Sequence, residues 1–359
     1  MSERIGGPGI AFDFKTPRQK KDPARMSVMI KETAMSESEM IAAAERALAD
    51  IAKIRAGVGR VIFGQESVVE RTLVALLAGG HALLVGVPGL AKTKLVETLG
   101  IVLGLDSRRI QFTPDLMPSD ILGSEVMEQD DQGKRSFRFI SGPIFAQLLM
   151  ADEINRASPR TQSALLQAMQ EYHVTVAGER HDLPTPFHVL ATQNPLEQEG
   201  TYPLPEAQLD RFLMQVDILY PEIEAERRIL LETTGIEDAR AQNVLDPERL
   251  KDVQHLIRRM PVSETVVEAI LKLVRSARPG QGNAETDKHV SWGPGPRASQ
   301  ALTLCARARA LYDGRLAPSI DDIRALAEPV LQHRMALTFA ARAEGMTVRD
   351  VVARLVKDI

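Results

Sequence analysis

Apolar positions follow two periods along the chain, and the change between them predicts two domains. Between residues 82 and 218, short apolar runs of strand length alternate with segments of helical period. This alternation is typical of a parallel sheet whose two faces are covered by helices. From residue 247 onward only helical periods recur, so we expect an all-helical domain of about 110 residues there. The pattern therefore predicts an α/β core followed by a helical domain.

Composition sets the remaining boundaries. Residues 1–37 are rich in Gly, Pro, Lys, Ser and Asp and have no period, which predicts a disordered N-terminal arm. A helical period begins at residue 38, so we expect the α/β core to cover residues 38–222. Residues 223–246 are mostly polar and are expected to form a crossover linker to the helical domain at 247–359.

Two stretches interrupt the alternation of strands and helices, and both predict hairpins at the edge of the sheet. The first lies near residues 122–141 and contains a polar turn with Gly133. The second lies near residues 172–188, where the turn Ala177-Gly178 separates an apolar run from a second run at 183–187. Hairpins of this kind either contact another molecule or only protect the edge of a sheet.

Charge and cysteine usage narrow the classes of function. Lys and Arg total 44 against 48 Asp and Glu, which gives a net charge of −4, and no basic run predicts nucleic-acid binding. The single cysteine, Cys305, excludes a disulfide framework and is typical of a reducing compartment, so we expect a cytoplasmic protein. No apolar run is long enough to predict a membrane segment, and no signal pattern opens the chain.

A glycine-containing loop follows the apolar run 82–85 and predicts a nucleotide site. Such a loop between a strand and a helix aims backbone N–H groups at phosphates. We expect Lys92 to reach the β- and γ-phosphates and the Thr93 hydroxyl to hold Mg²⁺. Ala91 replaces the second glycine of the usual pattern, and we expect a negative φ there, where alanine costs nothing. An ordinary Gly/Pro turn is the alternative. The predicted ATP-binding residues are Gly86, Val87, Pro88, Gly89, Leu90, Ala91, Lys92, Thr93 and Lys94.

Acidic residues end the apolar run 148–151. A buried parallel strand with this sequence would place Asp152 and Glu153 at its carboxyl end, where ligands of open α/β sheets bind. We expect Asp152 to bind Mg²⁺ through water and Glu153 to act as general base toward the attacking water. The alternative is a buried strand followed by two acids that begin a helix.

Two further segments carry candidate polar groups. Thr192 and Asn194 end another strand-like run and could hydrogen-bond the γ-phosphate or the attacking water, although an Asn before a proline is also an ordinary turn residue. Arg211 follows a short helical segment and precedes the run 213–217. A guanidinium supplied by a neighbouring subunit can stabilise charge in phosphoryl transfer, whereas a lone Arg more often forms a surface ion pair.

Longer strings in the sequence resemble the MoxR family of AAA+ ATPases. The resemblance covers about residues 45–340. In this family the phosphate loop often reads G-x-P-G-x-A-K-T, so Ala91 matches the family while it departs from the general motif. The matching strings are Gln111–Ile121, Gly142–Ala146, Ala151–Ala157 and Ala191–Phe212.

The resemblance implies a ring-forming ATPase, hexameric by expectation, that uses ATP and Mg²⁺. In such a protein Lys92 and Thr93 belong to the Walker A motif, and Asp152 and Glu153 to the Walker B motif. Asn194 would be the sensor 1 residue.

The same resemblance assigns roles to residues outside these motifs. Arg211 would be the arginine finger, and Arg297 corresponds to the sensor 2 arginine of the helical lid. Gln65, at the end of the segment Val61–Gln65, would line the adenine pocket. The two hairpins resemble the helix 2 insert and the pre-sensor 1 hairpin of the clade that also holds magnesium chelatases, where they face a pore or a client.

Several functions stay open at this point. The preferred one is an active ATPase that remodels or matures protein clients, with partners that carry von Willebrand factor A domains. A metal-chelatase-type ATPase subunit is a narrower form of it. A nucleotide-gated scaffold with little turnover would need Lys92 but not Glu153. A DNA motor is disfavoured by the acidic balance of the chain.

Overall fold

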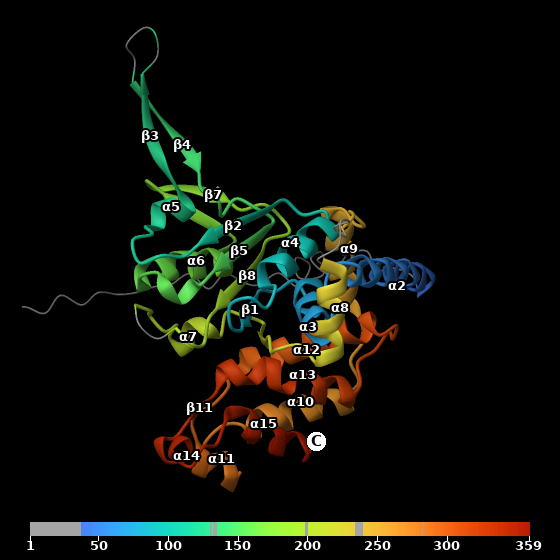
Figure 1. Ribbon diagram of the computed structural model, residues 1–359. Helices are drawn as coiled ribbons and strands as arrows, with labels where there is room; N and C mark the ends of the chain where they lie inside the picture. Colours follow the sequence, from blue (N-terminus) through green and yellow to red (C-terminus); the bar gives the residue numbers. More distant parts are fainter. Residues whose placement is uncertain (1–36, 130, 132–134, 198–199, 234–239, 282) are drawn as a thin grey trace, which may run out of the picture. The chain divides into compact units, whose positions relative to one another are not determined.

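A parallel sheet of five strands forms the centre of the α/β core (Figure 1). The computed structural model describes residues 37–129, 131, 135–197, 200–233, 240–281 and 283–359. Residues 1–36 of the predicted arm therefore lie outside the described residues, and Glu37 begins helix α2. Every neighbouring pair in the sheet is parallel, and the strand order is β2-β5-β8-β1-β9. The strands are β1 Ala82–Val85, β2 Ser107–Gln111, β5 Leu148–Asp152, β8 His188–Gln193 and β9 Met214–Asp217.

Helices cover both faces of this sheet. On one face, alternate strand residues such as Leu149 and Val189 pack with Leu165 and Met169 of helix α6 in one cluster. On the other face, α4 contacts β5, and α3 contacts β1 and β9. Burial on both faces explains why the inner strands β1, β5 and β8 are largely apolar without alternation. The core helices are α2 Glu37–Gly59, α3 Glu66–Leu77, α4 Lys92–Val102, α5 Pro118–Leu122, η1 Ile154–Arg156, α6 Pro159–Glu171 and α7 Glu206–Leu209. The predicted α/β fold class is confirmed.

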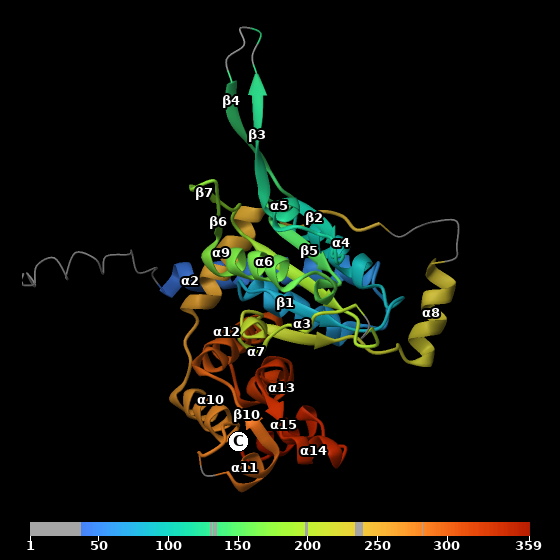
Figure 2. The same ribbon diagram turned by 90° about the vertical axis from the view of Figure 1, so that its left-hand side faces the viewer.

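Two antiparallel hairpins leave the core. Strands β3 Gly123–Gln129 and β4 Arg135–Ser141 pair along their length and extend beyond the sheet in both ribbon views (Figures 1 and 2). Strands β6 His173–Val176 and β7 Glu179–Asp182 form the second hairpin. Its return strand was expected at 183–187 and instead begins directly after the turn. The reason is that Ala177 and Gly178 both have positive φ, which makes a two-residue turn.

The C-terminal domain is helical, with one small sheet. Strand β10 Val290–Trp292 pairs with β11 Ala336–Leu337. The predicted linker 223–246 is not wholly a crossover, because helix α8 occupies Ile223–Thr233. The remaining helices are α9 Pro247–Arg259, α10 Glu264–Ser276, α11 Ala284–His289, α12 Pro296–Tyr312, α13 Ile320–Leu331, η2 Gln332–Arg334, α14 Phe339–Ala343 and α15 Val348–Val356.

Polar contacts join this domain to the core. Helix α12 packs against α3, and Arg309 of α12 contacts Glu70 of α3 with Nε to Oε1 at 3.0 Å.

Cys305 lies on the buried side of α12, and burial raises the pKa of its thiol to about 12, as expected for a packing residue. None of the helices in the described part of the chain is long and apolar enough to span a membrane.

Candidate active site

The phosphate loop joins β1 to α4 at the carboxyl edge of the sheet. Gly86 is required by close packing, because a Cβ there would lie 2.8 Å from the carbonyl oxygen of Ile218. The ammonium of Lys92 turns back onto the loop and donates to the carbonyls of Gly86 and Val87, the latter at 3.0 Å. Burial lowers the pKa of Lys92, opposed by the carboxylates of Asp152 and Glu153. Lys92 thus lies at the loop with both acids close enough to act on its charge.

The backbone at Ala91 differs from our expectation. Ala91 has φ +55° and ψ +24°, in the left-handed region, and it caps the N-terminus of α4. The expected negative φ is therefore wrong. The usual motif has glycine at this position for a steric reason, since a Cβ costs about 1 kcal/mol there. This chain carries that strain at the start of the helix that would face the phosphates.

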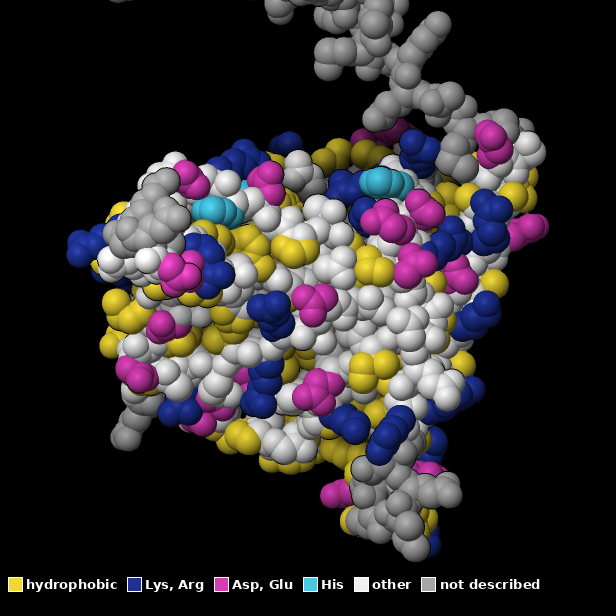
Figure 3. Space-filling model, turned by 90° about the horizontal axis from the view of Figure 1, so that it is seen from above, with side chains coloured by type: hydrophobic (Ala, Val, Ile, Leu, Met, Phe, Trp, Pro, Cys, Tyr) yellow, Lys and Arg dark blue, Asp and Glu magenta, His cyan; other side chains and the backbone are white. Residues whose placement is uncertain are grey.

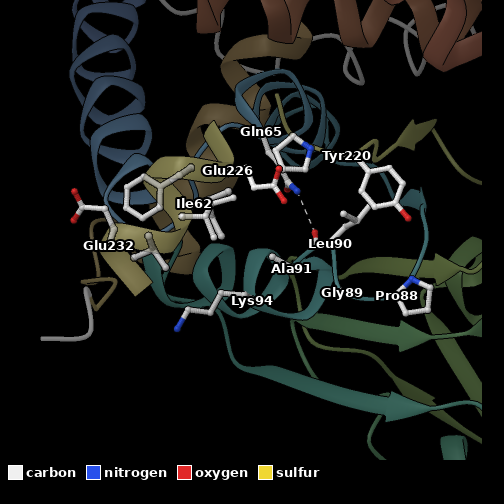
Figure 4. Close-up of a pocket in the computed structure, with 14 residues that line it drawn as sticks. Ile62, Gln65, Pro88, Gly89, Leu90, Ala91, Lys94, Tyr220, Glu226 and Glu232 are labelled. Atoms are coloured by element: carbon white, nitrogen blue, oxygen red, sulfur yellow. Dashed lines mark hydrogen bonds between the residues drawn. The ribbon is translucent and has the colours of Figure 1, made fainter. Parts of the chain in front are cut away.

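A cavity of about 510 Å³ adjoins the loop and has the size and lining of a nucleoside site (Figure 4). Ile62 and Tyr220 contribute apolar surface, and Glu226 of α8 forms part of the wall. Gln65 donates from Nε2 to the carbonyl of Leu90 at 3.1 Å. Its Oε1 is buried without a partner among the described residues, which suits an acceptor for an exocyclic amine such as that of adenine. Lys94 also lines this cavity.

Asp152 and Glu153 lie side by side at the end of β5, and Thr192 of β8 holds both. The Thr192 hydroxyl donates to Asp152 Oδ1 at 2.5 Å and accepts from the backbone N–H of Glu153 at 2.9 Å. Thr192 is fully buried. Thr192 was a candidate to hydrogen-bond the γ-phosphate or the attacking water, but its hydroxyl already donates one bond and accepts another. Its position follows from the register, which sets β8 beside β5.

Two side chains of β2 hydrogen-bond to the acidic pair Asp152 and Glu153, and neither was predicted from the sequence. Arg109 donates to Asp152 Oδ2 from Nε at 3.2 Å and from Nη2 at 2.5 Å. Gln111 donates to Glu153 Oε2 at 2.8 Å. Arg156 donates to the same oxygen at 2.9 Å, so Glu153 Oε1 takes no part in these bonds. The alternation of Arg109 and Gln111 around buried Ile110 could have indicated one shared face, but not the partner strand.

Asn194 follows β8 and is buried with 4% exposure. Its Oδ1 accepts from the backbone N–H of Leu196 at 3.1 Å, which is the bond of a turn residue. The side-chain N–H₂ is the part of Asn194 that could reach a phosphate oxygen or a water. Both roles weighed from the sequence are therefore compatible with one side chain.

Arg211 lies at the opposite edge of the sheet from the phosphate loop. Met214 of β9 pairs with Ala82 at the amino end of β1, and Arg211 precedes Met214. The loop begins after Val85, four strand residues later, which separates the two edges by about 13 Å. Arg211 instead shares a cavity of about 260 Å³ with His81 and Arg297. The two arginines predicted to act on the nucleotide are thus together, and apart from the loop of their own chain.

The arginine cavity is electropositive. Burial lowers the pKa of Arg211, and the charge of Arg297 lowers it further. Arg211 Nη1 is buried without a hydrogen-bond partner in the described structure. Asp210 lies near Arg297, with Oδ2 to Nη1 at 3.6 Å, and it also pairs with Arg334. The cavity therefore holds more guanidinium groups than carboxylates, which suits an anionic ligand.

The donors at the carboxyl edge fit Mg²⁺ with a nucleotide. Mg²⁺ in such sites takes one or two protein ligands, while water and phosphates supply the rest. Thr93, the second residue of α4, and Asp152 are the two candidates. No group of three or more His, Cys, Asp or Glu that could hold a metal occurs within the described ranges. Asp152 Oδ2 already accepts two bonds from Arg109, whereas Oδ1 accepts one from Thr192 and keeps a lone pair that can accept from a metal-bound water.

Comparison with known proteins identifies the family. The model of the ATPase family associated with various cellular activities (AAA) matches residues 81–214, and the AAA lid domain model matches residues 283–355. Chaperone MoxR1 of Mycobacterium tuberculosis is 42% identical over 304 residues, which cover 84% of this chain and 80% of the relative. The chain belongs to the MoxR family of AAA+ ATPases.

Other members of the MoxR family and a solved structure agree. Protein MoxR of Methylorubrum extorquens is 30% identical over 308 residues, covering 80% of this chain and 87% of the relative. The crystal structure of a proposed ATPase from Cytophaga hutchinsonii matches with a TM-score of 0.83 and 36% identity, over 91% of this chain and 99% of the other. The resemblance to MoxR proteins drawn from the sequence is confirmed, and the family is one of nucleotide-binding ATPases.

Proposed function

We propose that this MoxR-family chain hydrolyses ATP at an interface between subunits. The observation that carries the proposal is the separation of its two parts. The loop, Lys92 and the acids lie at one edge of the sheet, while Arg211 and Arg297 lie at the other. Arginines that act on the nucleotide must then come from a neighbouring copy, so we assign both Arg211 and Arg297 a role in trans.

The residues of each chain would divide the chemistry among them. The loop amides and Lys92 hold the β- and γ-phosphates, and the adenine cavity with Gln65 fixes the base. Mg²⁺, held through Thr93 and Asp152, would neutralise charge on the phosphates. Glu153 accepts a proton from the attacking water, and Asn194 helps to orient that water. Arg211 of the neighbour stabilises the charge that develops on the transferred phosphoryl group.

The arrangement favours a ring. An interface that joins the arginine edge of one copy to the nucleotide edge of the next is heterologous, and such interfaces close into rings when the rotation permits. We propose a hexamer on the basis of the family resemblance. Each nucleotide site would then be completed by one neighbour.

The work of the ring would be done on proteins. The relative from Mycobacterium tuberculosis is named a chaperone, which supports remodelling or maturation of a protein client. We place this work in the cytoplasm on the basis of the single cysteine. Hairpin β3–β4 supplies an exposed contact, because the cross-strand pair Met127 and Phe137 is 53% and 70% exposed. A partner with a von Willebrand factor A domain is proposed from the resemblance alone.

The surface charge does not favour nucleic acid. On the face shown in Figure 3, Lys and Arg side chains are interspersed with Asp and Glu and do not gather into one basic strip. This agrees with the net charge of −4 and supports a protein client over a DNA track.

A nucleotide-gated scaffold is the second candidate. Its support is the state of Glu153, whose Oε2 already accepts from both Gln111 and Arg156. These two bonds occupy Oε2, so the contacts must rearrange before that oxygen can accept a proton from water. In that case ATP binding would change the shape of the ring with little turnover.

Mixing of two inactive variants tests the proposal. Arg211→Ala should lower kcat by roughly 10³-fold with little change in the KM for ATP, since the finger contacts only the transition state. Glu153→Gln should be inactive by itself. Random mixing of the two should make about one interface in four complete and should restore activity in that proportion.

The exposed Arg259→Ala variant is the matched control and should keep wild-type activity. An absence of rescue at every mixing ratio would contradict the action of Arg211 in trans. Full activity of Glu153→Gln would instead show that another group is the base.

A further inference from the structure

Arg334 is a buried arginine that the proposed reaction does not use directly. It lies in η2, just after helix α13 of the C-terminal domain, and its side chain is 2% exposed. Its Nε donates to Asp210 Oδ1 at 2.7 Å, and Nη1 donates to the carbonyl of Val330 in α13 at 2.6 Å. The guanidinium therefore joins the C-terminal domain to the segment that precedes β9.

Three further bonds of Arg334 hold the backbone on both sides of Arg211. Nη2 donates to the carbonyls of Asp210 at 3.2 Å and Phe212 at 2.7 Å, and Nη1 donates to the carbonyl of Leu213 at 3.2 Å. These three carbonyls flank Arg211 in the chain. A planar guanidinium with five donors can bind them together with a carboxylate, which an ammonium cannot do.

Asp210 extends the contact to the second arginine of the cavity. Its Oδ1 accepts from Arg334, and its Oδ2 lies 3.6 Å from Nη1 of Arg297 at the start of α12. The Asp210 carboxylate thus lies between the buried Arg334 and the half-exposed Arg297. Arg211 is fixed through its backbone, and Arg297 through this shared carboxylate.

We propose that Arg334 is the positioning residue for both trans-acting arginines. It holds the 210–213 segment and Asp210 on helix α13, so that Arg211 and Arg297 reach the neighbour's nucleotide together. Movement of the C-terminal domain would then move both guanidinium groups as one unit. This inference rests on the proposed function, because it takes the two arginines to act on the neighbouring site.

The first test is the kinetics of Arg334→Lys. Lysine keeps the charge but loses the planar set of donors, so we expect kcat to fall roughly 10- to 100-fold, as for a displaced catalytic group. The KM for ATP should stay within about threefold, because the nucleotide site of the same chain lies at the other sheet edge.

Arg349→Met is the matched control. Arg349 of α15 also joins the C-terminal domain to the core, through Asp217 of β9 at 3.1 Å, and it pairs with Glu328 of its own domain at 2.7 Å, but it does not touch the 210–213 segment. Its kcat should stay within about twofold of wild type. Equal losses in both variants would overturn the proposal, since they would show only a loosened contact between domains.

The second test separates positioning from misfolding. An Arg334→Lys subunit keeps its own loop and acids, so mixing it with Glu153→Gln subunits should restore activity, because the latter supply intact arginines. If the lysine variant does not fold, Asp210→Asn replaces it, with the same expected loss of kcat and the same rescue.

The Arg211→Ala mixture with Glu153→Gln distinguishes the two possible failures. If that mixture shows no rescue, the proposed action in trans is wrong. If it shows rescue while the Arg334→Lys or Asp210→Asn mixture shows none, or if neither positioning variant loses kcat, the role assigned to Arg334 is wrong.

Discussion

The carboxyl and amino edges of the central sheet differ in the charged side chains that they carry. At the carboxyl edge, Lys92 lies near Asp152 and Glu153, and each acid is already held by a hydrogen-bond partner. At the amino edge, Arg211 and Arg297 share one cavity with few carboxylates. At the first edge the candidate metal and nucleotide ligands are nearly satisfied by hydrogen bonds, whereas the second edge is a cationic surface. The contrast supports the proposal that a neighbouring copy completes each edge.

The largest expected effect comes from the acidic edge. Glu153→Gln keeps the shape of the side chain and removes its charge, so we expect kcat to fall by roughly 10² to 10⁴. Binding of ATP should be retained, because the contacts of Glu153 are with Gln111 and Arg156 and not with the loop. Steady-state hydrolysis and equilibrium binding of labelled ATP measure the two effects separately.

Glu226→Gln on α8 is the matched control for that variant, since it removes a carboxylate that lines the nucleotide cavity. Its kcat should be close to that of wild type. Loss of ATP binding in Glu153→Gln would mean that the two edges do not divide the work as proposed.

The next prediction concerns pH and rests on two buried histidines, His81 and His188, at the amino edge of the sheet. Burial and the neighbouring His188 lower the pKa of His81 to about 3, and burial lowers that of His188 to about 4. In the unfolded chain both would titrate near 6.5, so below that pH the unfolded state binds more protons. The free energy of unfolding should therefore fall as the pH drops from 6.5 toward 4, by about 2 kcal/mol for each histidine at pH 5.

Urea unfolding at pH 7.5 and pH 5 measures this loss. In His188→Gln the difference between the two pH values should be smaller than in wild type, whereas the exposed His255→Gln should leave it unchanged. An unchanged pH dependence in His188→Gln would show that the buried histidines do not limit the stability of this edge.

Thr192→Val tests how tightly the acidic pair is held. The change removes the hydroxyl that joins Asp152 to the backbone of Glu153, with little change of shape. We expect about a tenfold lower kcat and a loss of about 1 to 3 kcal/mol of stability, because two polar groups lose a buried partner. Thr72→Val is the control, since its buried hydroxyl donates to the carbonyl of Val68 within α3. It should lose stability but keep kcat, and a tenfold loss there would remove the special role of Thr192.

The smallest expected effect lies in the phosphate loop. Ala91→Gly relieves a positive φ, so stability should be unchanged or higher by up to about 1 kcal/mol, with the KM for ATP within about twofold. Ala177→Gly is the comparison variant, because it relieves a similar positive φ in a hairpin turn outside the site. Ala49→Gly, on the exposed side of α2, should instead lose about 1 kcal/mol. A loss of that size in Ala91→Gly would mean that the left-handed backbone at this position is not strained.

Much of the fold could be predicted from the hydrophobic periods of the sequence and from the polar residues that end each apolar run. Strand-length runs ending in Asp152 and Gln193 predicted a sheet with polar groups at its carboxyl edge, and the fold class is confirmed. Helix α8 was missed because its exposed apolar residues, such as Ile223 and Leu231, lie among charged ones in a segment that looked like a linker. The φ of Ala91 was wrong because the expectation considered the cost to alanine and not the geometry that the loop imposes.

The site divides in the same way. Lys92, Thr93, Asp152 and Glu153 belong to short strings whose chemistry depends on local order, so the sequence could name them. The partners Arg109 and Arg334 could not be named, because their contacts join positions 43 and 124 residues apart. Arg334 in particular resembles any other arginine at the end of a helix until its burial is known.

By itself, then, the sequence determined which groups are the candidates for binding phosphate and metal, because a loop and a strand end position their own neighbours through local backbone geometry. It also placed Arg211 before a strand, which in a parallel sheet means the amino edge. Only the tertiary structure decided that Arg297 joins Arg211 there and that Arg334 holds the 210–213 segment around Arg211. Those contacts depend on how helices α12 and α13 pack on the core, and a periodic pattern fixes which face of a helix is buried but not what it is buried against.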